Sequence, residues 1–149
     1  MKIREAKIKD IDEILSIGNK IGEFRISEGL INFWPRHILQ NCIKSKTDLL
    51  IVAEKEYKII GFIVVNYNNT FKKAIIENIY IVPKFRKRGI AKQLLDIAIE
   101  KVISLKCEYI CALTNNKEAI DFYKRSGFEK GNEFAWLGKI ISKKFISIK

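Results

Sequence analysis

The stretch from Ile79 to Leu95, IYIVPKFRKRGIAKQLL, limits the fold more than any other part of this sequence. Its first residues are apolar and mostly β-branched, and Pro83 should end the strand because proline has no N–H for a ladder. A basic loop follows, and apolar residues then recur at helical spacing from Gly89 to Leu105. A strand, a short loop and a helix in this order predict that helices pack on a sheet in this chain.

Apolar periodicity and turn residues predict the other elements. Strands are expected over residues 2–7, 48–53, 59–67, 71–82, 107–113 and 135–145, with strand and turn over 127–134. Helices are expected to begin at Asp10, where Glu13 completes a capping box, at Pro35, at Gly89 and at Asn116, the last ending before Gly127. Residues 22–34 have no clean period, which predicts a loop with a short helical turn. The 149 residues suffice for one domain of ordinary size, so a single domain over residues 1–149 is expected.

Basic residues outnumber acidic ones by 28 to 17, which gives a net charge of +11. This excess favours a polyanionic partner, whether nucleic acid, acidic lipid or a phosphorylated cofactor, although a genome rich in lysine codons would produce the same bias. No apolar run approaches the roughly 20 residues of a membrane span, and the charged N-terminal stretch lacks the pattern of a signal peptide. A cytoplasmic protein without membrane contact is therefore expected.

The cysteines and the histidine do not form a recognisable site. Three cysteines, Cys42, Cys107 and Cys111, are too few for a secreted disulfide framework. Cys107 and Cys111 are four apart, but no histidine stands near them to complete a zinc site. His37 is the only histidine, so neither a metal site nor a Ser-His-Asp triad is expected.

The basic loop before the helix at Gly89 has the composition of an anion site. Arg86, Lys87 and Arg88 carry three positive charges beside a helix start, where backbone N–H groups are unpaired and the helix dipole is positive. Gly89 lets a bulky anion approach the backbone, and Ala91 keeps the next turn small. The stretch therefore suits a pyrophosphate, although a solvated basic turn would have the same composition.

A second informative stretch runs over residues 115–128, NNKEAIDFYKRSGF. On a helix, Asn116, Ala119 and Tyr123 lie on one face, because they stand at i, i+3 and i+7. This face pairs an amide at the helix start with a phenol one turn from its end. The alternative is that Tyr123 is a packed aromatic whose hydroxyl reaches water.

Together the two stretches resemble the signatures of the GNAT superfamily of N-acetyltransferases. The matching residues are Arg86-Lys87-Arg88-Gly89-Ile90-Ala91 and Asn116-x-x-Ala119-x-x-Phe122-Tyr123-x-x-x-Gly127-Phe128. The order of the elements also matches, and the resemblance covers nearly the whole chain. It implies a mixed α/β (α+β) fold: a mostly antiparallel central sheet of six to seven strands with about four helices. It also implies an acetyl-CoA cleft where the strands at 71–82 and 107–113 splay apart.

The resemblance further implies roles for individual residues. The backbone of Ile79, Tyr80 and Ile81 would pair with the pantetheine arm, and the backbone of residues 87–92 would hold the pyrophosphate. Asn116 would contact the cofactor arm, and Tyr123 would lie near the thioester sulfur. The cofactor site so implied also contains Arg86, Lys87, Arg88, Gly89, Ile90, Ala91, Lys92, Ala119 and Phe122.

Acetyl transfer to an amine requires a base, because an alkyl ammonium has a pKa of about 10.4. Glu77 is the candidate, since several small-amine enzymes of the family have a glutamate at this strand position that acts through water. Strand alternation predicts that it projects on the same side as Ile79 and Ile81. The alternative is a charge on a half-exposed strand. Tyr123, with an ordinary pKa of about 10, is the candidate acid that protonates the departing thiolate.

The acceptor is expected to be a small amine. The ribosomal-protein N-terminal acetyltransferases of the family have a glutamate five residues before the motif asparagine, where this chain has Cys111. Cys111 as a nucleophile is less favoured than a buried strand cysteine. The variable segment 22–37 would build the acceptor pocket, with candidate residues Glu23, Phe24, Glu28 and Trp34. Plain packing of its aromatics is the alternative.

The resemblance therefore predicts an acetyl-CoA-dependent N-acetyltransferase acting by direct attack of a primary amine such as a polyamine. A protein N-terminus or lysine is the alternative acceptor. A second class is a basic RNA- or ribosome-binding module, or a CoA sensor, without turnover. No nucleic-acid motif supports the former, so the expected partners are acetyl-CoA and an amine. A homodimer is left open.

Overall fold

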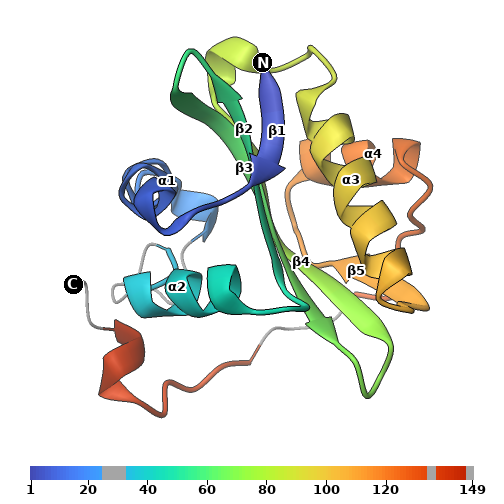
Figure 1. The fold of residues 1–149 in the computed structure, drawn as a ribbon. Coiled ribbons are helices and arrows are strands. Elements are labelled where there is room, and N and C mark those ends of the chain that lie inside the picture. The colour runs from blue at the N-terminus through green and yellow to red at the C-terminus, as the bar shows by residue number, and fades with distance from the viewer. Residues whose placement is uncertain (25–32, 134–136, 147–149) are drawn as a thin grey trace.

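The computed structural model describes residues 1–24, 33–133 and 137–146, and these residues form a five-stranded sheet between two pairs of helices (Figure 1). The strands lie in the order β1-β2-β3-β4-β5, and β1 to β4 are antiparallel while β5 runs parallel to β4. Their bounds are β1 Lys2–Glu5, β2 Leu49–Lys55, β3 Lys58–Asn68, β4 Lys73–Ile81 and β5 Tyr109–Ala112. The predicted mixed and mostly antiparallel sheet is confirmed.

The helices cover both faces of the sheet. Helices α1 (Ile11–Gly18) and α2 (Arg36–Lys44) lie on one face, and α3 (Ile90–Ser104) and α4 (Lys117–Arg125) lie on the other (Figure 1). Short 3-10 turns lie at Ile8–Asp10, Gly22–Phe24, Pro83–Phe85 and Lys143–Ile146. Among the described residues, no helix has the length and apolar character needed to cross a membrane.

Burial on both faces explains the apolar run of β3. Ile63 and Val65 belong to the core under α3, whereas Phe62 and Val64 belong to the core under α1 and α2. A strand covered on both sides has no polar face, so its sequence is apolar throughout rather than alternating. Gly61 is required here, because a Cβ at this position would come within 2.7 Å of the Tyr80 carbonyl oxygen on β4.

An extra residue interrupts the pairing of β4 with β3. Val64 pairs with Asn78 and Val65 pairs with Ile76, so Glu77 has no partner on β3 and forms a β-bulge. The residues before and after the bulge, Ile76 and Ile79, both pack in the core under α3. The prediction that Glu77 projects on the same side as Ile79 and Ile81 is therefore wrong, because alternation holds only along an uninterrupted ladder.

Strands β4 and β5 pair over only four residues. The ladder joins Lys73–Ile76 to Tyr109–Ala112 and then stops, while β4 continues to Ile81. Within the described part of the chain, no strand pairs with the outer edge of residues 77–81. The predicted opening between these two strands is therefore present.

The sheet has fewer strands than predicted. The described residues of the stretches 127–134 and 135–145 form no strand, and residues 134–136 lie outside the described residues. Leu137 and Ile141 are 91% and 94% exposed, so this segment buries no apolar face against the sheet. Instead its end reaches the α2 side, where the ring of Phe145 meets Trp34 with centroids 6.0 Å apart. A strand depends on such burial and on a partner, and apolar residues alone do not specify either.

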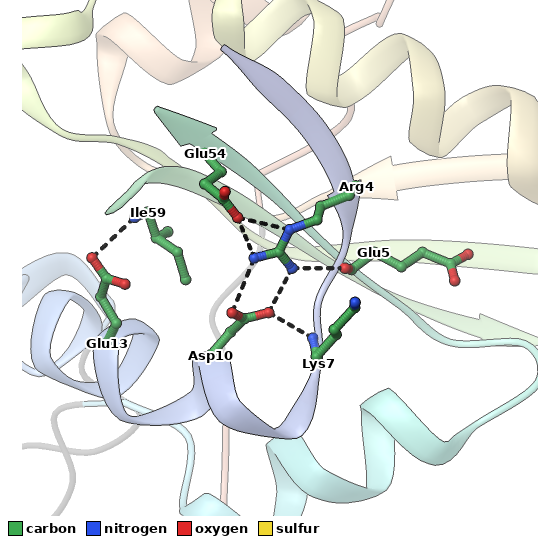
Figure 2. Close-up of polar contacts among 7 residues, drawn as sticks. All are labelled: Arg4, Glu5, Lys7, Asp10, Glu13, Glu54 and Ile59. Carbon is green, nitrogen blue, oxygen red and sulfur yellow. Dashed lines mark hydrogen bonds and ion pairs between the residues drawn. The ribbon is translucent and has the colours of Figure 1, made fainter. Parts of the chain in front are cut away.

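An ion-pair cluster replaces the predicted capping box at α1 (Figure 2). Arg4 on β1 donates to Asp10 at 2.7 and 3.1 Å and, through Nε, to Glu54 on β2 at 2.8 Å. Asp10 also accepts from the backbone N–H of Lys7 at 2.7 Å, and Glu13 accepts from the N–H of Ile59 at 2.9 Å. The hydrogen bonds from Arg4 hold the pKa of Asp10 below its ordinary value. The cluster thus joins two strands to the first helix.

We predict that Arg4→Met lowers the free energy of unfolding by about 3 kcal/mol, because it leaves two largely buried carboxylates facing each other. Since the folded state depresses the pKa of Asp10, this contribution is present at neutral pH and is lost as the pH falls below the ordinary value of 3.8. The difference in free energy of unfolding between wild type and Arg4→Met, measured with urea, should therefore decrease as the pH is lowered.

The matched control is Lys101→Met, which removes an exposed ion pair with Glu5. Its cost should stay below about 1 kcal/mol. Equal losses of unfolding free energy in Arg4→Met and Lys101→Met would show that the Arg4 cluster stabilises the fold no more than an exposed ion pair does.

Candidate active site

The loop before α3 forms a basic cradle with exposed backbone. Residues 86–89 are exposed, and Lys87 and Gly89 have left-handed φ angles of 59° and 75°. The first bond along α3 runs from Gln93 N to Gly89 O at 3.1 Å. The N–H groups of residues 90–92 therefore have no acceptor within the described chain. A Cβ at Gly89 would meet nothing within 4 Å, so the space above this helix start is open.

The side chain of Arg86 does not enter the cradle. Its Nε donates to the carbonyl of Ile81 at 2.9 Å, and its guanidinium lies 5.3 Å from the centroid of the Tyr80 ring. Arg86 thus fastens the loop to the end of β4. Arg88 and Lys84 lie beside Phe85 in the same loop, with their charged groups 5.8 and 5.0 Å from the centroid of its ring, and add positive charge to the loop.

Asn116 begins α4 and links it to the segment after α1. Its Oδ1 accepts from the N–H of Ala119 at 3.0 Å, which satisfies one donor of the first helical turn. Its Nδ2 donates to Oε1 of Glu23 at 3.0 Å. A residue predicted on the cofactor side and one predicted on the acceptor side are therefore in direct contact.

Tyr123 lies on the α3 side of the sheet. It is only 8% exposed, and the rings of Phe122 and Phe128 lie with centroids 5.2 Å from its own. Burial raises the pKa of Tyr123 well above its ordinary value of 10, so the hydroxyl keeps its proton. Within the described residues its oxygen has no hydrogen-bond partner. At neutral pH the side chain is therefore a protonated phenol, the form that can donate a proton, and burial makes it a weaker acid than an exposed tyrosine.

A pocket of about 240 Å³ lies on the opposite face, under α2. Trp34 forms part of its wall, and the indole Nε1 donates to Oδ1 of Asn78 at 2.6 Å. Asn78 stands next to the bulge, so the bulge places both Glu77 and the amide that orients Trp34 on this side. The lining residues are Trp34, Ile38, Leu39, Asn41, Cys42, Asp48, Val64, Val65, Asn66 and Glu77.

The carboxyl group of Glu77 is half-buried in this pocket, with no hydrogen bond or ion pair to another described residue. Burial raises the pKa of Glu77, and the charge of Asp48 raises it further. Burial also raises the pKa of Cys42 to about 12, with smaller effects from Asp48 and Glu77. The pKa of Cys111 is raised as well, mainly by burial, which argues against a thiolate nucleophile at either position.

The remaining predicted acceptor residues divide between packing and pocket. Phe24 packs on Phe33, Phe62 and Tyr80 with centroids 5.6, 6.3 and 5.9 Å away, so its described contacts are those of a core aromatic. Glu28 lies outside the described residues. Sequence reasoning missed Asp48, because an aspartate before a strand has the pattern of an ordinary turn residue. Among the described side chains, no three histidine, cysteine or acidic residues gather to hold a metal ion.

Comparison with known families decides the assignment. The model of the acetyltransferase (GNAT) family matches residues 21–128, which include the cradle, the bulge and α4. The chain belongs to the GNAT family. An uncharacterized N-acetyltransferase of Methanocaldococcus jannaschii is 30% identical over 141 residues, covering 86% of this chain. This chain spans only 60% of the length of that GNAT relative.

Solved structures agree with the GNAT fold. A predicted acetyltransferase from Clostridium acetobutylicum, solved with acetyl-CoA, has a TM-score of 0.74 at 25% identity over 92% of this chain and 95% of its own. A transcriptional regulator from Bacillus halodurans has a TM-score of 0.74 at 26% identity, covering 93% and 99%. A ribosomal-protein-alanine N-acetyltransferase from Brucella melitensis has a TM-score of 0.73 at 23% identity, covering 89% and 86%, and shows the fold alone.

The residues present fit acetyl-CoA. The unpaired N–H groups at the start of α3 and the open space at Gly89 suit a pyrophosphate, and the free edge of residues 77–81 offers backbone groups to an extended amide-containing arm.

We predict that Gly89→Glu weakens acetyl-CoA binding at least about 100-fold, because it places bulk and negative charge in the cradle and disfavours the left-handed backbone. Calorimetric titration measures this effect.

Gly131→Glu is the matched control for charge. A Cβ at Gly131 also meets nothing within 4 Å, but this glycine lies outside the cradle and has no left-handed φ. Its affinity for acetyl-CoA should match that of wild type. Unchanged affinity in Gly89→Glu would remove the cradle as the pyrophosphate site.

Proposed function

We propose that this chain is an acetyl-CoA-dependent N-acetyltransferase that moves an acetyl group to the primary amine of a small molecule by direct attack. One observation carries the proposal: the bulge in β4 aims a half-buried, unpaired carboxylate, Glu77, into a pocket beside the open edge of the same strand. A base on one side and a phosphate cradle on the other suit a reaction between an amine and a bound thioester.

The cofactor supplies the activated acetyl group as a thioester. The backbone N–H groups of residues 90–92 hold its pyrophosphate in this proposal, and the edge of residues 79–81 positions its arm. Arg86 keeps the cradle at a fixed place relative to that edge through its bond to Ile81. These groups act by binding and orientation.

Proton transfer is assigned to two side chains on opposite faces of the sheet. Glu77 takes the proton of the ammonium, directly or through one water, so that the nitrogen lone pair becomes available. Its raised pKa brings it closer to that of an amine and makes it a stronger base than an ordinary glutamate. The amine nitrogen attacks the thioester carbon, the C–S bond breaks, and Tyr123 donates its proton to the departing sulfur. The second proton that the new amide nitrogen loses returns to the Tyr123 oxygen, directly or through water, while Glu77 passes the first one to solvent.

A small amine is favoured over a protein terminus by two features. The pocket under α2 has a volume of about 240 Å³, which suits a small amine better than a polypeptide chain. Cys111 stands where the N-terminal acetyltransferases that the motif resembles have a glutamate, and its thiol has a raised pKa and does not replace that carboxylate. Polyamines are accordingly the first acceptors to test.

We predict that thiol release from acetyl-CoA with a panel of primary amines depends on Glu77. Glu77→Gln should lower kcat/KM about 100-fold near neutral pH, because the amine then loses its proton only to solvent. Since burial and the charge of Asp48 raise the pKa of this carboxyl, the acidic limb of the wild-type profile should lie above the ordinary glutamate value of 4.5.

In Glu77→Gln that limb should move to higher pH, towards the pKa of the free amine. Glu56→Gln, which changes an exposed glutamate in the β2–β3 turn, is the control and should behave as wild type. No thiol release with any primary amine would refute the proposed activity, and an unshifted profile would refute Glu77 as the base.

We predict that Tyr123→Phe lowers turnover about 100-fold while the affinity for acetyl-CoA stays nearly constant, because only the proton donor is removed from an otherwise unchanged apolar site. Tyr57→Phe is the matched control, since Tyr57 is 95% exposed. Steady-state rates together with calorimetry separate the two effects. Full activity in Tyr123→Phe would assign the proton donation to another group.

A further inference from the structure

The pocket under α2 differs in charge from the rest of the molecule. The chain carries a net charge of +11, yet the described lining of this pocket contains no lysine, arginine or histidine. Its charged residues are two carboxylates, Asp48 and Glu77. A pocket whose described lining holds two acidic side chains and no basic one creates a local negative potential in a positive protein.

Asp48 is held in place by the sheet. It stands directly before β2, and its Oδ1 accepts from the side-chain amide of Asn66 and from the backbone N–H of Tyr67, both at 3.0 Å. Both donors come from the end of β3, so the carboxylate cannot swing away from the pocket without losing two bonds. No cationic side chain among the described residues pairs with it, and Oδ2 makes no hydrogen bond there.

The apolar lining of the pocket suits an aliphatic stem. Trp34 is fixed by its bond to Asn78, and Ile38 and Val64 supply further apolar surface. An indole face also attracts a cation. The pocket therefore combines apolar surface with two carboxylates, one from the residue before β2 and one from the bulge of β4.

We propose that Asp48 is the residue that selects the acceptor: it binds the second cationic group of a diamine whose reacting amine lies at Glu77. The inference rests on the proposed acetyl transfer and specifies its substrate class. An amine that carries a carboxylate is repelled by Asp48, and a simple alkylamine leaves Asp48 without a partner. Both are therefore poorer acceptors than an aliphatic diamine.

The test compares butane-1,4-diamine with butylamine as acceptors for wild type and Asp48→Asn. Wild type should prefer the diamine at least about 10-fold in kcat/KM, in line with one charge-assisted contact. In Asp48→Asn the ratio of the two kcat/KM values should fall to near one, because the KM of the diamine rises. Because Asp48 also raises the pKa of Glu77, its removal changes the rate with every amine, and the ratio of the two acceptors cancels that effect.

Glu100→Gln is the control for net charge, because Glu100 is an exposed residue of α3 on the other face and should keep the wild-type preference. Circular dichroism and urea unfolding establish that Asp48→Asn is folded. If that variant does not fold, the preference of wild type for the diamine over butylamine and over 4-aminobutanoate still decides the question. Wild type without this preference, or a folded Asp48→Asn that retains it, would overturn the inference.

A calorimetric titration of butane-1,4-diamine separates this inference from the proposed function. Diamine binding that is weakened about 10-fold in Asp48→Asn, without thiol release, would leave the role of Asp48 standing and refute acetyl transfer. Thiol release at equal rates with butane-1,4-diamine and butylamine would support acetyl transfer and refute the role of Asp48.

Discussion

The β-bulge at Glu77 interrupts the pairing of β4 with β3. It decides which side chains of β4 face the core under α3 and which face the pocket under α2. Before it, Ala74 and Ile76 pack under α3; after it, Ile79 and Ile81 return to the same core. Glu77 and Asn78 are consecutive residues and yet both serve the α2 side, one as an unpaired carboxylate and the other as the acceptor of the Trp34 indole. A regular strand would have directed one of them into the apolar core, where an unpaired charge is costly.

The early end of the β4–β5 ladder complements the bulge. After Ile76 the edge of β4 has no neighbouring strand in the described chain, so its backbone groups require water or a ligand. The loop that follows is fastened to this edge by the bond from Arg86 to Ile81, and α3 starts from that loop with N–H groups unpaired. The bond from Arg86 therefore holds the unpaired strand edge and the unpaired helix start next to each other.

How much of this could be predicted depended on the range of the interactions. Pro83 and Gly89 act within a few residues, so the end of β4, the cradle and α3 were predictable, as was α4 with its Asn116 start. The bulge was not, because it exists only in the register of two strands. The Arg4 cluster joins residues 50 positions apart, which removed the predicted capping box. The predicted last strands failed for the same reason: their apolar residues indicate a strand only where a partner edge and a covering surface are also present.

The hydrogen bond between Glu23 and Asn116 has a thermodynamic consequence. It spans 93 positions of sequence and connects the segment after α1 to the first turn of α4. The Asn116 amide has a second N–H and the Glu23 carboxylate a second oxygen, so a ligand competes with this bond only where it takes the same N–H or the same oxygen. Where a ligand does so, binding at one residue alters the free energy of binding at the other by the same amount in both directions. One contact thus links the turn after α1 thermodynamically to the start of α4.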